Sequence, residues 1–524
     1  MLGGKGKIKL QKEPKSPVLM NTGFTMSPAI KIREDEVEKF WKLETIGISE
    51  TIGGKEDRDA LWKFQKHIEG KQDGRYIVGL PWKTDSPKVP YNLGICIGRL
   101  KGALKKLEKK PELFEEYDKV FRQQIEQGVI EEVPRQEAGP LVSYLPHQPV
   151  LTADKATIKL RVVFDASAKD RHGNSVNKQL LRGPVMLNDL SGILLRFRLS
   201  NIAIIADVEK AFLQIELRED DRDCTRFMWV KDPGKAEADN IIAYRFCRVP
   251  LSLMSSPFFL AATLYKQMGQ ADSKISKMIM RNLYVDNVIL TADTTQEADQ
   301  LYQESKQLFA QCKMKLRGFT SNDRNFISKL SDEDKGDLTA ETKVLGINWK
   351  LKTDEMEMKT KRHKEGTNTK REVLKFVASN YDPLGWISPV LLPIKVFIQK
   401  LWKKKYTWDQ EFDNEELHEY QKLMVDWEEM RFIIPRKITH KKEYAVRQLH
   451  VFTDASVNAY AACVYTPEAS ARGIHTSLLM TKTRLCPVKS LTIPRLELMA
   501  AMIGTRLVTY VKKEMQLNDA NITL

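Results

Sequence analysis

The chain has 524 residues, of which 42% are hydrophobic, so it can bury more than one core, which excludes a wholly disordered protein. Its formal net charge of +15 is consistent with a polyanionic partner such as nucleic acid, or with a well-solvated surface. The six cysteines lie far apart, without CxxC spacing, so neither a zinc site nor a disulfide framework is indicated.

The N-terminal part of the chain is predicted to be a flexible lead followed by helices. Residues 1–30 are rich in Gly and Lys and lack the apolar segment of a secretory signal, so we expect a flexible lead, the remnant of an upstream region. Residues 31–135 predict a helical lead-in, because apolar side chains recur there at helical spacing between Lys and Glu residues. These apolar positions include Leu104, Leu107, Leu113, Phe114, Tyr117, Phe121 and Ile125.

Residues 136–354 alternate strand-like and helical runs, which predicts an α+β fold. The longest apolar stretch, 249–265, is interrupted by Pro257 and is short for a membrane span, so we expect no membrane partner. Residues 355–371 are polar and basic and predict a loop or linker. Residues 372–445 are predicted to be helical, and a new strand pattern begins at Arg447.

The first candidate catalytic residue is Asp207, which ends an apolar strand predicted at 202–206. A carboxylate at the end of a buried strand is held rigidly, as a metal ligand must be. An ordinary helix N-cap is the alternative interpretation, because the pattern becomes helical directly after Asp207.

The second candidate site is Asp286, which together with Asn287 separates two short apolar runs in residues 283–290. This pattern predicts a β-hairpin with the Asp-Asn pair as its two-residue turn, and both residue types also occur in turns for purely structural reasons. If the tip lies opposite Asp207, the carboxylates could hold two Mg²⁺ ions that activate a hydroxyl and stabilise a leaving group.

A basic strand is predicted at 158–165, before both acidic sites. Period-2 alternation places Lys159 and Arg161 on one face and Leu160, Val162 and Phe164 on the other. The basic pair could bind a triphosphate, or it could simply form a solvated strand face.

The order of these segments resembles the polymerase region of BEL/Pao-type long-terminal-repeat retrotransposons. A basic strand, a strand ending in Asp, a Ser-Pro segment and an aromatic-x-Asp hairpin follow one another, and the resemblance extends from about Glu38 to the C-terminus. The strings that carry it are Tyr-Leu-Pro-His-Gln-Pro-Val at 144–150, Arg-Val-Val-Phe-Asp-Ala-Ser at 161–167, Ala-Asp-Val-Glu-Lys-Ala-Phe at 206–212, Asp-Arg-Asp-Cys-Thr-Arg-Phe-Met-Trp at 221–229, Val-Leu-Gly-Ile at 344–347 and Tyr-Asp-Pro-Leu-Gly-Trp at 381–386.

The resemblance implies a right-hand polymerase followed by a truncated ribonuclease H-like α/β domain. Fingers and palm would occupy 136–354, thumb and connection 355–445, and the partial ribonuclease H domain 446–524. The implied activity is RNA-directed DNA synthesis from dNTPs, on an RNA template with a DNA primer, by two Mg²⁺ or Mn²⁺ ions. The implied setting is intracellular: a cytoplasmic particle with access to the nucleus.

The resemblance also assigns roles to individual residues. Asp207 and Asp286 would bind the metal ions, while Lys155 and Arg161 would contact the triphosphate. Phe212 would exclude the ribose 2′-hydroxyl and so select deoxynucleotides, unless it is a plain core aromatic. The segment 250–257 would line the nucleotide pocket, 344–349 would grip the primer, and 395–445 would follow the duplex through phosphate contacts.

Two residues depart from the family pattern. Asn287 replaces a second Asp among the catalytic residues at the hairpin tip, which should lower the metal affinity. Ser252 stands where the family has Gly, and its side chain could crowd the template-nucleotide pocket. The alternative function is therefore a catalytically decayed, nucleic-acid-binding relic. An aspartic peptidase is a further alternative, but neither Asp-Thr-Gly nor Asp-Ser-Gly occurs in the chain.

The C-terminal segment resembles the start of a ribonuclease H domain. Asp454 ends a strand predicted at 449–456, and Pro494 opens a helix with Glu497 in its first turn. The resemblance implies that Asp454 and Glu497 hold metal for cleavage of the RNA strand of a hybrid, although a Glu there also suits the helix dipole. Further carboxylates are expected beyond Leu524, so these 524 residues alone are expected not to cleave RNA.

Overall fold

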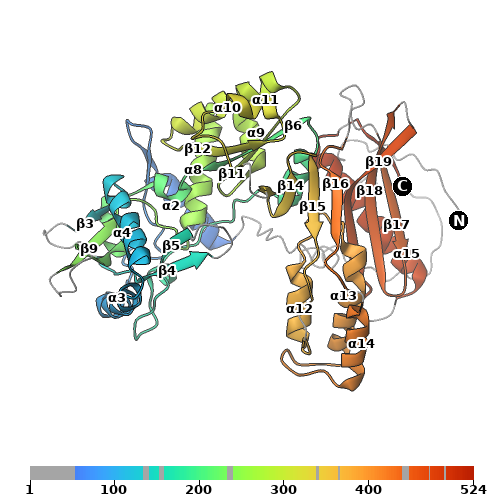
Figure 1. The fold of residues 1–524 in the computed structure, drawn as a ribbon, viewed down its shortest axis with the longest axis horizontal. Helices are drawn as coiled ribbons and strands as arrows, with labels where there is room; N and C mark the ends of the chain where they lie inside the picture. Colours follow the sequence, from blue (N-terminus) through green and yellow to red (C-terminus); the bar gives the residue numbers. More distant parts are fainter. Residues whose placement is uncertain are drawn as a thin grey trace, which may run out of the picture.

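A computed structural model describes the chain apart from residues 1–53, 134–140, 153–158, 233–239, 338–341, 364–365, 426, 439–447, 471–472, 489–490 and 518. Helices and strands are mixed throughout these described residues, in four-stranded, three-stranded and two-stranded sheets. The predicted α+β fold class is therefore confirmed (Figure 1).

The N-terminal half packs helices against small sheets. The helices are α2 (Lys55–His67), α3 (Leu93–Leu107), α4 (Pro111–Glu126) and α5 (Val176–Gln179). One sheet has the order β1-β2-β7, formed by β1 (Glu69–Gly70), β2 (Tyr76–Val78) and β7 (Glu216–Leu217). A second has the order β3-β9-β8, formed by β3 (Ile130–Glu132), β9 (Ile241–Phe246) and β8 (Phe227–Val230). A third is the hairpin of β4 (His147–Thr152) and β5 (Lys159–Phe164).

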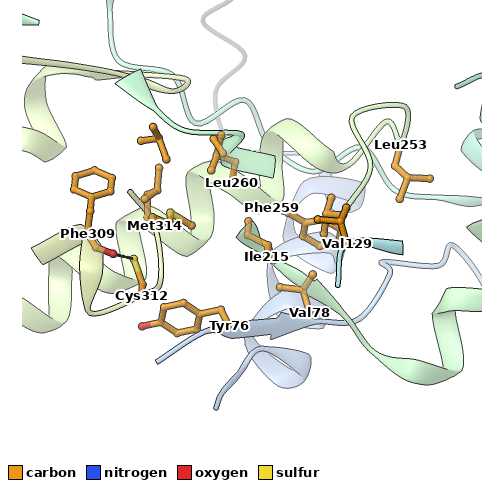
Figure 2. Close-up of a cluster of buried hydrophobic side chains, with 14 of the residues drawn as sticks. Tyr76, Val78, Val129, Ile215, Leu253, Phe259, Leu260, Phe309, Cys312 and Met314 are labelled. Atoms are coloured by element: carbon orange, nitrogen blue, oxygen red, sulfur yellow. Dashed lines mark hydrogen bonds between the residues drawn. The ribbon is translucent and has the colours of Figure 1, made fainter. Parts of the chain in front are cut away.

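Aromatic rings fill the space between these elements. Tyr117 and Phe121 of α4 lie on the buried ring of His147, whose Nδ1 is 2.6 Å from the Tyr117 hydroxyl. Buried side chains then continue from β2 through α8 (Ser256–Ala271) to the segment after α10 (Thr295–Ala310), as Figure 2 shows for Tyr76, Phe259 and Met314. The predicted helical lead-in is confirmed at α3 and α4, where Leu107, Tyr117 and Phe121 are buried.

A four-stranded antiparallel sheet, here called the Asp207 sheet, has the order β10-β11-β6-β12. Its strands are β10 (Leu283–Tyr284), β11 (Asn287–Ala292), β6 (Ile202–Val208) and β12 (Leu316–Ser321). One face belongs to the core formed with α8, α9 (Lys274–Asn282), α10 and α11 (Arg324–Lys329). The other face, with Ala203, Ile205 and Ile289, packs in a core with α6 (Leu190–Phe197).

The next sheet corrects one prediction. Its order is β13-β14-β15-β16, formed by β13 (Thr342–Val344), β14 (Ile347–Lys350), β15 (Glu355–Lys359) and β16 (Arg431–Pro435). Residues 355–359 were predicted to be a loop, which is wrong: they form a central strand because Met356 and Met358 are buried between two partner strands. Between β15 and β16 lie α12 (Lys370–Ser379), α13 (Ser388–Lys403) and α14 (Asn414–Met424), which enclose their own core.

The C-terminal sheet has the order β19-β18-β17-β20 and is covered by one long helix. Its strands are β17 (Gln448–Ala455), β18 (Ala459–Ser470), β19 (Gly473–Leu485) and β20 (Asn521–Thr523), with β20 parallel to β17. Helix α15 (Ile493–Glu514) buries Leu496, Ile503 and Leu507, as its spacing predicted. No helix of the described ranges combines the length and hydrophobicity that a membrane crossing requires.

Candidate active site

The Asp207 sheet brings the two predicted acidic sites together. In the β6–β11 register, Asn287 lies directly opposite Asp207, and the Val208 amide donates to the Asp286 carbonyl at 2.9 Å. Residues 203, 205 and 207 share one face of β6, and residues 287 and 289 share the same face of β11, because side chains alternate along a strand. Asp207 and Asn287 therefore project on the same side.

The hairpin turn lies one residue earlier in the chain than the Asp-Asn pair predicted. Tyr284 pairs with Asn287, so the two turn residues are Val285 and Asp286, and the prediction of an Asp-Asn turn is wrong. Val285 adopts a φ of 58°, a left-handed conformation that is unusual for a β-branched residue. Such strain persists only where surrounding structure enforces it, and here it puts Asp286 at the tip, where the Asn287 side-chain amide donates to its Oδ1 at 3.1 Å.

Burial and neighbouring charges shift the pKa of Asp207. Partial burial between the neighbouring strands raises the pKa of Asp207, repulsion from Asp286 raises it further, and the positive charge of Arg317 opposes both effects. Arg317 is the register partner of Asp207 on β12, and it also forms an ion pair with Glu209 at 2.9 Å. The Asp207 side chain remains accessible to solvent, so a metal ion can reach it.

Gly318, which the sequence reasoning missed, lies beside this carboxylate in a left-handed conformation. It has a φ of +68°, and a Cβ at this position would lie 3.8 Å from Asp207 Oδ2. The β6–β12 register shifts between Arg317 and Thr320, which is the irregularity of a β-bulge. A Gly close to a strand end is a weak signal in a single sequence, because many glycines serve only turns.

The donor set at the hairpin fits a hard cation. The described residues contain no group of three or more His, Cys, Asp or Glu side chains with the geometry of a metal site. Two carboxylates, Asp207 and Asp286, and the amide oxygen of Asn287 remain, and Mg²⁺ is commonly held by one or two carboxylates together with substrate phosphates. The residues present therefore fit a site that is completed by a substrate.

The structure describes most of the other predicted substrate-binding residues. Arg161 lies on the exposed face of β5, and Leu160 and Val162 on the other face are packed against the core, as the alternation predicted. Lys155 lies outside the described residues. Phe212 lies in a short 3-10 turn (Ala211–Gln214) directly after β6, and it is partly buried against the main core.

Ser252 is joined to the basic strand by Asn177, another residue that the sequence reasoning missed. The Asn177 side-chain amide donates to the Ser167 hydroxyl at 2.8 Å and to the Ser252 carbonyl at 3.0 Å. The side-chain carbonyl of Asn177 accepts a hydrogen bond from the Met254 backbone amide at 2.8 Å. One side chain thus fixes the 252–254 loop against the segment after β5, while the Ser252 Oγ is buried and has no hydrogen-bond partner.

The ribonuclease H-like pair lies on two elements that pack together. Asp454 is near the end of β17, and Glu497 is in the first turns of α15, with both side chains exposed. The helix approaches the sheet most closely at Gly504, where a Cβ would lie 2.5 Å from a Thr453 methyl group. Glu497 is seven residues before Gly504, which corresponds to about 10 Å along the helix.

Comparisons with known proteins relate the C-terminal part of the chain to one family. Residues 369–524 match the family described as Pao retrotransposon-like RNaseH-like domain. No curated protein matches the sequence closely enough to be counted. The structure of the foamy viral protease-reverse transcriptase dRH in complex with ds DNA is similar, with a TM-score of 0.48 and 14% identity over 75% of this chain and 59% of that chain.

The foamy viral protease-reverse transcriptase in complex with RNA/DNA hybrid has a TM-score of 0.47 and 14% identity, over 93% of this chain and 54% of that chain. The chain therefore spans little more than half the length of these two solved structures. The predicted resemblance to Pao-type retrotransposons is confirmed by the match of residues 369–524 to this family.

Proposed function

We propose that this chain is an RNA-directed DNA polymerase of a Pao-type retrotransposon. One observation carries the proposal: the strand register puts Asp207 opposite Asn287 and beside Asp286, at the open end of a buried sheet. A carboxylate on β6 and a second one in the turn that leads into the neighbouring strand β11 provide the oxygen donors that nucleotidyl transfer needs for its metal ions. The net charge of +15 suits an RNA template, a DNA primer and their hybrid.

In this proposal each residue of the site has a separate role. Asp207 and Asp286 would hold the two Mg²⁺ ions, which when bound activate the primer hydroxyl and stabilise the pyrophosphate leaving group. Arg161 would bind the triphosphate from the exposed face of β5, with Lys155 in support. Phe212, directly after β6, would contact the sugar and exclude a 2′-hydroxyl. The α12–α14 region would contact phosphates of the duplex.

In this proposal Asn287 lowers the metal affinity of the site but does not abolish it. Its carbonyl is a neutral donor where a carboxylate would be charged, and its amide group already donates to Asp286 at 3.1 Å. This hydrogen bond has to be broken or shared when an ion binds Asp286 Oδ1. We expect a higher Mg²⁺ requirement than an Asp at this position would give.

Primer extension on an RNA template tests the proposal. The natural chain, Asn287→Asp and Asp207→Ala would be compared with Mg²⁺ and dNTPs. Extension by the natural chain that Asp207→Ala abolishes supports the polymerase, and a lower Mg²⁺ requirement in Asn287→Asp supports the role of Asn287. Extension that survives in Asp207→Ala would refute the proposed site.

A nucleic-acid-binding relic is the second candidate, and two observations favour it. Asn287 occupies a position opposite the catalytic carboxylate, and the buried Ser252 hydroxyl has no partner. Folded protein that binds an RNA/DNA hybrid, but extends no primer even as Asn287→Asp with Ser252→Gly, would establish the relic. The ribonuclease H-like carboxylates Asp454 and Glu497 would be part of a second metal site in either case.

A further inference from the structure

Arg196 of α6 joins helix α15 to the Asp207 sheet. Its side chain is only 11% exposed and forms an ion pair with Glu514, the last residue of α15, which is 19% exposed. Burial lowers the pKa of Arg196, and the negative charge of Glu514 counteracts this effect. A partly buried guanidinium depends strongly on such a partner, because an unpaired charge in this environment is costly.

The remaining donors of Arg196 contact the base of the catalytic hairpin. Its Nε donates to Asn282 Oδ1 at 2.7 Å, and its second terminal nitrogen donates to the Arg281 carbonyl at 2.6 Å. Asn282 is buried, ends α9 and directly precedes β10, the strand that leads to Asp286. One planar group therefore connects α15 to the first residues of the hairpin.

Other contacts at this junction show that it is a built interface. Arg281 donates to the Glu514 carbonyl at 3.3 Å, and the Tyr510 hydroxyl of α15 donates to Asp189. A cavity of about 730 Å³ lies beside the junction and is lined by Arg196, Asn282 and Glu514 among others. The base of the hairpin is held by these polar contacts as well as by the buried side chain of Leu283.

We propose that Arg196, held by Glu514, is a positioning residue that sets the placement of the catalytic hairpin, so that docking of α15 on α6 controls the geometry at Asp286. The catalytic consequence rests on the proposed polymerase function. The structural coupling does not, since the mobility of the hairpin can be measured in protein without activity.

Gly192 offers a substitution that disturbs the ion pair and deletes no charge. A Cβ on Gly192 would lie 2.5 Å from Glu514 Oε2 and 3.1 Å from the Arg196 terminal nitrogen, so Gly192→Ala should displace the Glu514 carboxylate. Alanine is also a better helix former than glycine, which protects α6 itself. Glu514→Gln removes the charge instead, and Asp299→Asn removes a carboxylate from the separate Lys329–Asp299 ion pair as the control.

The first readout is amide hydrogen exchange of residues 283–288 in the full chain. We expect exchange about tenfold faster in Gly192→Ala and Glu514→Gln, with unchanged exchange in β17 and β18, and no change in Asp299→Asn. Unchanged hairpin exchange in both variants would overturn the proposal. Exchange that rises equally in β17 and β18 would also overturn it, since Glu514 would then be only a general stabilising residue.

The second readout is the Mg²⁺ concentration for half-maximal primer extension. A displaced Asp286 should raise this concentration several-fold in Gly192→Ala and Glu514→Gln, whereas a mere loss of folded protein would lower the rate equally at every Mg²⁺ concentration. If the natural chain and Asn287→Asp both fail to extend a primer, the proposed function fails, and hydrogen exchange alone still decides the coupling.

Discussion

Asn287 faces Asp207 across the β11–β6 ladder as its register partner, with Asp286 next to it at the hairpin tip. This arrangement places a neutral amide at the position where a third carboxylate would repel the other two. Repulsion from Asp286 already raises the pKa of Asp207, so Asn287 limits the negative charge that the metal-free site must tolerate.

Replacing Asn287 by Asp should therefore make stability depend on metal. Without Mg²⁺ the added charge opposite Asp207 should lower the free energy of unfolding by about 1–2 kcal/mol, and Mg²⁺ should restore it. Thermal unfolding with a chelator and with Mg²⁺ measures both effects. Asn414→Asp adds the same charge at an exposed position of α14, and its Mg²⁺ response should equal that of the natural chain. Equal responses of the two variants would refute the cation site.

His147 should make the N-terminal core sensitive to acid. Burial lowers the pKa of His147 to about 4, and the hydrogen bond of its Nε2 with the Met228 carbonyl, at 2.9 Å, opposes the shift. The unfolded state, with an ordinary pKa of about 6.5, binds the proton first as the pH falls. The free energy of unfolding should thus decline from about pH 6.5 to about pH 4, by up to about 3 kcal/mol.

The measurement is urea unfolding at several pH values for the natural chain and for His147→Gln, which cannot take up a proton. The variant should lose most of the pH slope in this window. His172→Gln changes an exposed histidine and should retain the slope. An identical slope in His147→Gln would show that other groups cause the acid sensitivity.

The glycine of the Tyr-Asp-Pro-Leu-Gly-Trp string lies in close contact with β19. Gly385 has a φ of +77°, and a Cβ there would lie 2.3 Å from the Thr481 carbonyl oxygen of β19. The Thr481 backbone is also held in place, because its amide donates to the Leu384 carbonyl at 2.9 Å. Gly385→Ala should cost about 2–4 kcal/mol in unfolding free energy.

Chemical denaturation of Gly385→Ala measures this cost. Gly102→Ala in the exposed middle of α3 is the matched control, because a Cβ there would meet no atom within 4 Å. It should be neutral or stabilising by up to about 1 kcal/mol. Similar effects of the two substitutions would contradict the close approach of the 381–386 segment to β19.

Ser252 should be replaceable with a gain in stability. Its buried Oγ has no hydrogen-bond partner, so Ser252→Ala should raise the free energy of unfolding by about 1 kcal/mol. Ser276→Ala should have the opposite effect, since the buried Ser276 hydroxyl accepts from the Ser273 amide at 2.9 Å and donates to its carbonyl at 3.0 Å. Equal signs for the two variants, measured by denaturation, would contradict this account of Ser252.

Local chemistry in the sequence predicted the individual strands of the site, but not their pairing. Asp207 at the end of a buried strand and Arg161 on an exposed strand face followed from composition and period alone. The hairpin turn was misplaced by one residue because Asp and Asn are good turn formers, whereas the register forces Val285 into the turn at φ 58°. Tertiary pairing outweighed local preference there.

Long-range contacts explain the other gaps. Residues 355–359 alternate Glu and Met in a charged surrounding, and they form a central strand by pairing with β14 and with β16, which lies more than 70 residues later. Asn177 and Arg196 are single polar residues whose roles depend on partners 75 and 318 residues away. No spacing rule in one sequence connects such positions. The boundaries predicted between fingers, palm, thumb and connection remain predictions.

The most direct test of the central claim is extension of a DNA primer by one nucleotide on an RNA template, with Mg²⁺ as the sole divalent cation. The natural chain should add the complementary deoxynucleotide, and Asp207→Asn, which keeps the shape of the side chain, should lose at least about a hundredfold in rate. Undiminished extension by Asp207→Asn would contradict the proposal that the carboxylates at the β6–β11 ladder form the polymerase site.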